Sequence, residues 1–205
     1  MSRHVSFAIG MFIGFIMAIA AFGGPRVRAD AADPQKPGHN AELQRLYNED
    51  QADRTPPAGK PIDWTVVGPR DRIREARIME LYRSGALKTG HDYHNAAMVL
   101  QHASEADRQL LAHEFCIVAI AKGERDARWL CAASEDRFLM NIGRPQRFAT
   151  QYHGESKNGE PLVLKLYKVD PEVTDALRAE LKCPPMAVAQ QHEKEANEIF
   201  SGKKP

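Results

Sequence analysis

The sequence predicts a mainly α-helical domain of antiparallel helix hairpins, with a β-hairpin and a following helix at its C-terminal end. Between residues 71 and 142, apolar side chains recur at helical spacing and glycines separate the segments. Short connections between such segments fold neighbouring helices back on each other. After Pro145 the apolar residues alternate instead, which is the pattern of β-strands.

The first helix is expected over residues 40–53, where Leu43, Leu46 and Tyr47 share one face. Segment 55–61 contains Pro-Pro and Gly, so it predicts a loop. Four helices are expected next, over residues 71–84, 92–102, from Ser104 to Gly123, and 124–142.

Glycines and a capping pattern set the ends of these four helices. Gly85, Gly123 and Gly143 follow the apolar periods, and glycine readily takes the left-handed conformation that ends a helix. Ser104 and Asp107 resemble a capping box at the start of the third helix, with Asp in place of the usual Glu. Alanines in all of these helices would let them approach closely.

The C-terminal part is expected to begin with two strands, over residues 147–153 and 162–169, joined at Asn158-Gly159. Asp170-Pro171 predicts the start of a helix, because Asp caps helices and Pro suits their first position. A weaker terminal helix is expected over residues 186–200. Residues 40–200 thus form one domain, with the β-hairpin at about 147–169.

Composition supports a globular domain and argues against nucleic-acid binding. The chain has 205 residues, with 28 Lys or Arg and 27 Asp or Glu, for a formal net charge of +1. A nucleic-acid-binding protein would show a basic excess or patch, so we predict no nucleic-acid partner. With 43% hydrophobic and 27% charged residues, the chain can form a core.

The N-terminal segment 1–31 has the pattern of a secretory signal peptide. Arg3 precedes an uncharged run over residues 5–22, Gly23-Gly24-Pro25 ends the run, and Ala29-Asp30-Ala31 offers a cleavage site. We therefore expect a secreted or periplasmic protein, in which residues 32–39 form a polar spacer before the domain.

The alternative is that residues 5–22 remain as a membrane anchor. Arg26 and Arg28 follow the run and reduce the charge asymmetry that favours a cleaved signal. As a helix, the run would span about 27 Å, which is close to the thickness of a bilayer's apolar layer. Contact with a membrane is expected only through this segment.

Four histidines, His91, His94, His102 and His113, fall within 23 residues. Their spacing lacks the tighter patterns of known zinc sites, such as H-E-x-x-H, so we predict no metal and no cofactor. His102 and His113 are candidates for a catalytic base, because imidazole titrates near neutral pH. His113 stands among apolar residues, so its alternative role is to complete a buried polar network.

Further polar residues are candidates for a catalytic or binding site. Asp136 and Arg137 are adjacent in a helix and point about 100° apart, so each needs a partner elsewhere. Gln146 and Gln151 flank a helix-to-strand junction, where amides either bond free backbone groups or line a cleft. We predict one polar cluster of eight residues: Gln51, Arg54, Gln101, His102, Asp136, Arg137, Gln146 and Gln151.

If Arg137 belongs to a buried ion pair, Arg137→Met should cost about 3–5 kcal/mol.

Several of these residues carry a resemblance to a known family. The motifs are Glu49-Asp50-Gln51-x-x-Arg54, Gln101-His102, Asp136-Arg137, Gly143-x-Pro145-Gln146-x-Phe148-x-Thr150-Gln151, Asn158-Gly159-x-Pro161-Leu162 and Val169-Asp170. As a set, between about residues 43 and 185, they resemble a bacterial family classed only as a domain of unknown function. The resemblance implies a mostly helical domain with a site of these polar residues, and it implies no reaction. The family pattern has Gly where this chain has Ala149, so a backbone approach that requires Gly would be lost.

Two of the three cysteines are placed symmetrically about the Gly123-Glu124 turn, Cys116 seven residues before it and Cys131 seven residues after it. An antiparallel helix hairpin would bring them to similar heights. They could form a disulfide in an oxidising compartment, or pack as two small residues in a tight interface. Cys183 is then an odd thiol.

The functional hypothesis is a module that binds a small molecule or a protein in a polar cleft. The alternative is a hydrolase-like enzyme with His102 or His113 as base, Asp136 orienting it, and Arg54 or Arg137 binding an anionic group. If His113, Asp136 and Gln146 converge on an open pocket, the enzyme is favoured. If these residues are dispersed or sealed in the core, the binding module is favoured.

Overall fold

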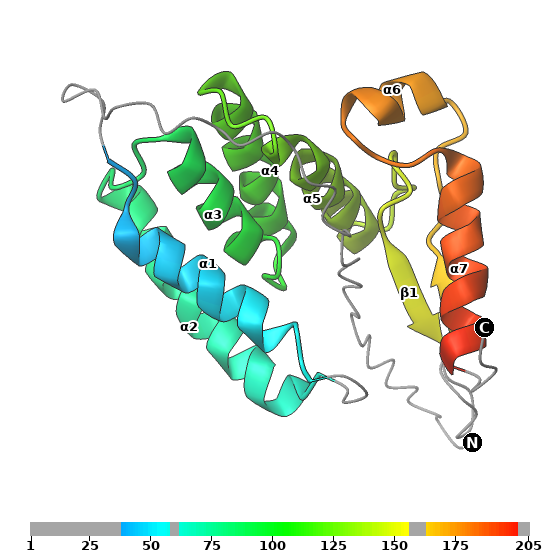
Figure 1. The fold of residues 1–205 in the computed structure, drawn as a ribbon, viewed down its shortest axis with the longest axis horizontal. Coiled ribbons are helices and arrows are strands. Elements are labelled where there is room, and N and C mark those ends of the chain that lie inside the picture. Colours follow the sequence, from blue (N-terminus) through cyan, green and yellow to red (C-terminus); the bar gives the residue numbers. More distant parts are fainter. Residues whose placement is uncertain (1–37, 58–61, 156–162, 201–205) are drawn as a thin grey trace, which may run out of the picture.

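The computed structural model describes residues 38–57, 62–155 and 163–200, and it shows the mainly helical fold with a small antiparallel β-hairpin that the sequence predicts (Figure 1). The expected signal segment, most of the spacer and the Asn158-Gly159 turn lie outside the described residues. Within the described ranges, none of the helices has the length and apolar character needed to cross a bilayer.

The first two helices are α1 (Ala41–Asp53) and α2 (Trp64–Arg83). Asn40 caps α1, because its side chain accepts hydrogen bonds from two backbone N–H groups of the first turn. The predicted start of α2 at residue 71 was wrong. The helix begins at Trp64, seven residues earlier, with Asp63 as its N-cap. It contains Pro69, although a proline in a helix interior usually marks a break.

Three helices follow: α3 (Gly90–Leu100), α4 (Ala106–Ala121) and α5 (Ala127–Asn141). The capping box predicted at Ser104 and Asp107 does not form, because Glu105 is the N-cap of α4 and its side chain makes no capping bond. The capping box instead joins Thr89 and Asp92 at the start of α3. As predicted, the chain takes a positive φ at Gly85, Gly123 and Gly143, each just after a helix.

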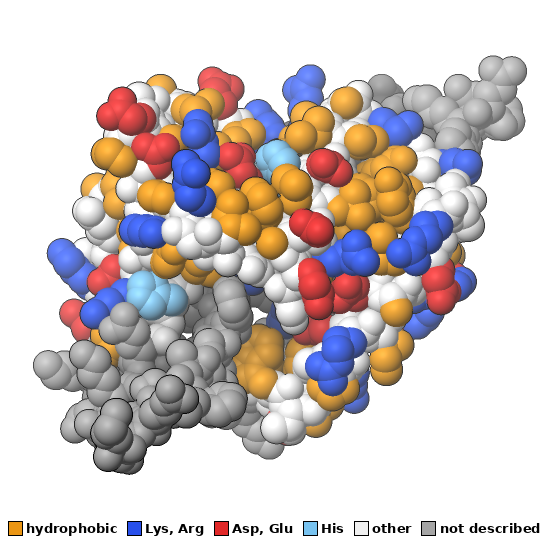
Figure 2. All heavy atoms as spheres, turned by 180° about the vertical axis from the view of Figure 1, so that it is seen from behind, with side chains coloured by type: hydrophobic (Ala, Val, Ile, Leu, Met, Phe, Trp, Pro, Cys, Tyr) orange, Lys and Arg blue, Asp and Glu red, His pale blue; other side chains and the backbone are white. Residues whose placement is uncertain are grey.

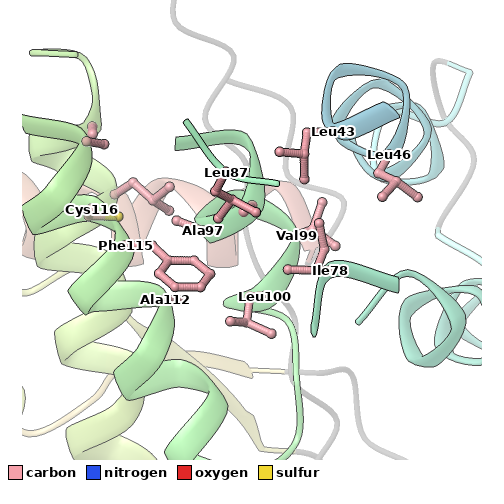
Figure 3. Close-up of a cluster of buried hydrophobic side chains, with 14 of the residues drawn as sticks. Leu43, Leu46, Ile78, Leu87, Ala97, Val99, Leu100, Ala112, Phe115 and Cys116 are labelled. Carbon is pink, nitrogen blue, oxygen red and sulfur yellow. The ribbon is translucent and has the colours of Figure 1, made fainter. Parts of the chain in front are cut away.

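The main apolar core joins all five helices. Leucines of α1 meet Ile78 of α2 and Val99 of α3, and Phe115 of α4 packs nearby (Figure 3). Helix α4 makes extensive contacts with both α3 and α5. Small residues allow this close approach, and seven of the alanines in these three helices are fully buried: Ala96, Ala97, Ala112, Ala119, Ala127, Ala132 and Ala133.

The C-terminal part contains strands β1 (Tyr152–Glu155) and β2 (Val163–Leu166), which pair antiparallel. In the part of the chain that the structure describes, β1 begins five residues later than predicted and β2 ends three residues earlier than predicted. Helix α7 (Met186–Phe200) packs against β2, where the Asn197 side chain accepts from the N–H of Leu164 and donates to its carbonyl. A side chain of α7 thus satisfies backbone groups at the open edge of the sheet.

The helix predicted to start at Asp170 begins later, as α6 (Asp175–Glu180) with Thr174 as its N-cap. Asp170 forms a turn instead, because its carboxylate accepts the N–H of Glu172. On the molecular surface, acidic and basic side chains are intermixed over the face opposite to that of Figure 1 (Figure 2).

Candidate functional site

The eight polar residues predicted to form one cluster separate into two. We call the first the turn cluster: Asp136, Gln146, Gln151 and the backbone of residues 146–151. We call the second the arginine cluster: Asp50, Gln51, Asp53, Arg54, Asp71, Arg74, His102 and Arg137. In the described part of the chain, no hydrogen bond or ion pair joins the two.

In the turn cluster, the carboxylate of Asp136 is fully buried and bound on both oxygens. Oδ1 accepts the N–H groups of Arg147 and Phe148 at 2.6 and 2.9 Å. Oδ2 accepts the N–H and the hydroxyl of Thr150 at 3.1 and 2.8 Å. Burial raises the pKa of Asp136, and these hydrogen bonds oppose the rise. This carboxylate therefore holds the turn and orients no histidine.

The two glutamines of the turn cluster also bind backbone. The Gln146 side chain donates to the carbonyls of Gln151 and Tyr167, and it accepts the Gln151 N–H at 2.8 Å. The Gln151 side chain donates to the carbonyl of Ala133. Between them, Ala149 adopts a φ of 59°, in the left-handed region that favours glycine. The alanine therefore keeps the turn, at a cost in strain.

The arginine cluster begins as a network of ion pairs between α1 and α2. Arg54 donates to Asp50 and to Asp71, both at 2.7 Å. Arg74 donates to Asp71 at 2.6 Å and to Asp53 at 2.8 Å. Both guanidinium groups are buried; Arg54 has two carboxylate partners, and Arg74 has three, because its Nε also lies 3.9 Å from Oδ1 of Asp50.

His102, just after α3, lies against this network without a hydrogen bond at Nε2. The Nε2 atom is 3.6 Å from Oδ2 of Asp50. Burial lowers the pKa of His102 well below its usual value, and Arg54, Arg137 and Arg74 lower it further, so the ring is neutral at pH 7. Burial also raises the pKa of Asp50 to about 7, against the opposing charges of Arg54 and Arg74.

Arg137 differs from the other arginines of the cluster because it has no partner. Its side chain is buried, with 9% of the residue exposed, and within the described residues it makes no hydrogen bond or ion pair. Burial lowers its pKa to about 10, with a further contribution from Arg54 and an opposing one from Asp50. The group is therefore still a cation at neutral pH.

Gln101 and Gln51 border the same cluster. The Gln101 side chain donates to the sulfur of Met98, and its buried Oε1 has no hydrogen-bond partner. The Gln51 side chain donates to Asp50 at 2.8 Å. Three of the predicted binding residues (Gln51, Arg54 and Arg137) and one predicted catalytic residue (His102) thus belong to the arginine cluster, whereas Gln101 directly precedes His102 in the chain and binds Met98.

His113 lies apart from both other catalytic candidates. Its Nδ1–H donates to the carbonyl of Cys131 at 2.9 Å, which ties α4 to α5. This is the network role that the sequence left open for it. His113, Asp136 and Gln146 do not converge on a pocket, since Asp136 and Gln146 are sealed and bind backbone.

The other histidines and the cysteines have separate surroundings. His91 bonds Gln44, and the ring of His94 lies beside that of Tyr47. In the described ranges, no three His, Cys, Asp or Glu side chains are arranged to hold a metal ion. All three cysteines are free and buried, so Cys116 and Cys131 pack as thiols. Burial raises the pKa of Cys131 to about 11, which makes it a poor nucleophile.

A pocket of about 330 Å³ adjoins the arginine cluster from outside, in the groove between α1 and α2. It is lined by Glu49, Ala52, Asp53, Arg70, Ile73 and Arg74. Sequence reasoning missed Asp71 and Arg74 as members of the cluster. The i, i+3 spacing of Asp71 and Arg74 could have indicated an ion pair on one helix. This spacing is common on helix surfaces, so it does not distinguish a buried cluster from an exposed pair.

Comparison of the chain with models of known protein families, with curated proteins and with solved structures finds no match.

Proposed function

We propose that the chain is a binding module for a small anion, and that Arg137 is the group that holds it. The observation that carries the proposal is the buried guanidinium without a partner. A buried charge is costly unless it is paired, and the other two buried arginines of the cluster each have at least two carboxylate partners. An anionic ligand would supply the missing partner.

The surroundings of Arg137 support an anion over a cation or an apolar ligand. Burial is the main cause of the lowered pKa of His102, and the positive charges of Arg54, Arg137 and Arg74 lower it further, so these arginines disfavour a second cation at this place. Arg137 and the His102 side chain retain 9% and 11% exposure, which gives this end of the cluster contact with solvent.

A binding module fits the geometry better than the hydrolase-like alternative. That alternative needed Asp136 to orient a histidine, and Asp136 instead holds the turn with all of its bonds directed to residues 147–150. His113 is bound to a backbone carbonyl.

The experiment is thermal unfolding of the full chain with added inorganic phosphate or propionate, compared between wild type and Arg137→Met. The matched control is Arg144→Met, which removes an exposed arginine two residues beyond the end of α5's C-cap. We expect at least one anion to raise the unfolding temperature of the wild type and the control but not of Arg137→Met. Equal shifts in all three proteins would mean a general salt effect and would refute the proposal.

We further propose, from the pattern of residues 1–31 alone, that the module works outside the cytoplasm after cleavage near Ala32. N-terminal sequencing of periplasmic or secreted material tests this, and an intact Met1 would refute cleavage.

A further inference from the structure

We propose that the outward face of α2 is a docking surface for an acidic amphipathic helix of another protein. The proposal is independent of the anion site at Arg137. It rests on an exposed apolar stripe of α2, on the pocket beside this stripe and on the arginines that flank it. We call the stripe the α2 stripe: Val66, Pro69, Ile73 and Ala76.

The α2 stripe faces away from the core. Its four residues are all exposed, and their spacing of three and four residues places them on one side of the helix. Buried Val67, Arg74 and Ile78 occupy the opposite side. Ile73 is 70% exposed, the highest value among the large apolar residues of the described ranges. The spacing is that of the a and d positions of a coiled coil, a pattern that a second helix covers with its own apolar side chains.

The pocket between α1 and α2 adjoins the α2 stripe and offers a place for an anchoring side chain. Ile73 lines this pocket of about 330 Å³ together with Ala52 of α1. The stripe and the pocket therefore form one continuous surface that shares Ile73. A partner's apolar side chain in the pocket would remove Ile73 from water, and buried anchors of this kind carry most of the binding energy of an interface.

The flanks of the α2 stripe are basic. Arg70 and Arg72 lie on opposite sides of Ile73, since residues two positions apart on a helix point about 160° apart. Arg72 is exposed, and within the described residues it makes no hydrogen bond or ion pair. The carboxylates of Glu49 and Asp53 at the pocket are already paired with arginines of this chain. Acidic residues beside a partner's apolar side chains would therefore complement the unpaired charge of Arg72.

The same features argue against a second copy of this chain and against a membrane. If α2 packed against α2 of another copy, in either direction, the flanking positions would bring arginine against arginine. Helices that lie in a membrane interface carry large apolar residues such as Trp, Phe and Leu, whereas half of the α2 stripe is Pro69 and Ala76. The partner that fits is a helix with an apolar stripe and acidic flanks.

The test uses two synthetic peptides with Leu at the a and d positions of every heptad. The flanking e and g positions are Glu in the acidic peptide and Lys in the basic peptide, so that like charges keep each peptide from pairing with itself. Binding of each labelled peptide to the full chain is followed by fluorescence anisotropy. The wild type is compared with Ile73→Ser, with Arg72→Glu and with a matched control, Ile117→Ser, which removes an exposed isoleucine of α4.

We expect the acidic peptide to bind the wild type about tenfold more tightly than the basic peptide. Ile73→Ser should weaken binding of the acidic peptide by about tenfold, because the anchoring contact is lost, whereas Ile117→Ser should leave it unchanged. Arg72→Glu should weaken it by roughly threefold and should strengthen binding of the basic peptide. All three positions are exposed, so the variants should keep the unfolding temperature of the wild type.

Absence of saturable binding of the acidic peptide to the wild type would overturn the proposal, as would equal losses in Ile73→Ser and Ile117→Ser. A wild-type dimer in analytical ultracentrifugation that dissociates in Ile73→Ser would overturn it in favour of a second copy. Binding of the wild type, but not of Ile73→Ser, to phosphatidylglycerol vesicles would overturn it in favour of a membrane.

Discussion

Asp136 and Arg137 are neighbours in α5, both are buried, and they have opposite charges, yet their surroundings differ completely. Asp136 accepts hydrogen bonds from three backbone N–H groups and one hydroxyl, all from the turn that follows the helix. Arg137 has no hydrogen bond or ion pair within the described residues. A buried charged group whose hydrogen bonds are all satisfied stabilises the fold. A buried charged group without a hydrogen bond or ion pair is instead available to a ligand.

The largest expected effect is that of Asp136→Ala, which should lower the free energy of unfolding by about 3–5 kcal/mol, because it leaves several buried donors without an acceptor. Urea denaturation measures this loss. Thr150→Val is the matched control, since it removes only one hydroxyl from the same carboxylate and should cost about 1 kcal/mol. Similar small losses for both variants would mean that Asp136 does not hold the turn.

The buried carboxyl group of Asp50 also allows a test by pH. Burial raises the pKa of Asp50 to about 7, so the folded chain retains this proton at a pH where the unfolded chain has lost it. The resulting stabilisation is complete below about pH 4 and is lost as the pH rises to about 7, with a slope of at most about 1.4 kcal/mol per pH unit.

Asp50→Asn has no proton to lose at this position. Its free energy of unfolding should therefore fall less than that of the wild type between about pH 4 and pH 7, as measured by urea denaturation at several pH values. Parallel curves for the two proteins would show that Asp50 is not the group that titrates.

A smaller effect is expected at the strained residue of the turn cluster. Ala149 has a φ of 59°, which costs an L-residue roughly 1–2 kcal/mol, while Gly would make the unfolded chain more flexible. Ala149→Gly should therefore stabilise the protein by about 0.5–1 kcal/mol in chemical denaturation. Ala132→Gly, inside α5, should destabilise it by about 1 kcal/mol or more. A loss of stability in both variants would contradict the strain at Ala149.

The sequence predicted the helices well and their boundaries less well. The apolar periods and the glycines after α2, α4 and α5 located the five helices, because both signals act within a few residues. The start of α2 was misplaced because Asp63 caps a helix that continues through Pro69. The shortened first strand has a different reason, since the residues before it fold around Asp136, a contact with another element that no local pattern reports.

The candidate site was only partly predictable. Sequence reasoning selected Arg54, His102 and Arg137, which the structure brings into the arginine cluster. Sequence reasoning could not distinguish these residues from Gln146 and Gln151. A polar residue at the end of a helix or strand gives the same sequence pattern whether its side chain binds backbone groups or has no partner. That difference depends on which partners the fold brings near them, and no pattern of neighbouring residues reports it.

Equilibrium unfolding of Arg137→Met beside the wild type, without and with propionate, tests the central claim most directly. If Arg137 were part of a buried ion pair, as the sequence had led us to expect, its loss should cost about 3–5 kcal/mol. An unpaired guanidinium leads to the opposite expectation, that Arg137→Met is as stable as the wild type or up to about 1 kcal/mol more stable, and that propionate stabilises only the wild type. A loss of more than about 1 kcal/mol, together with equal responses to propionate, would contradict this account.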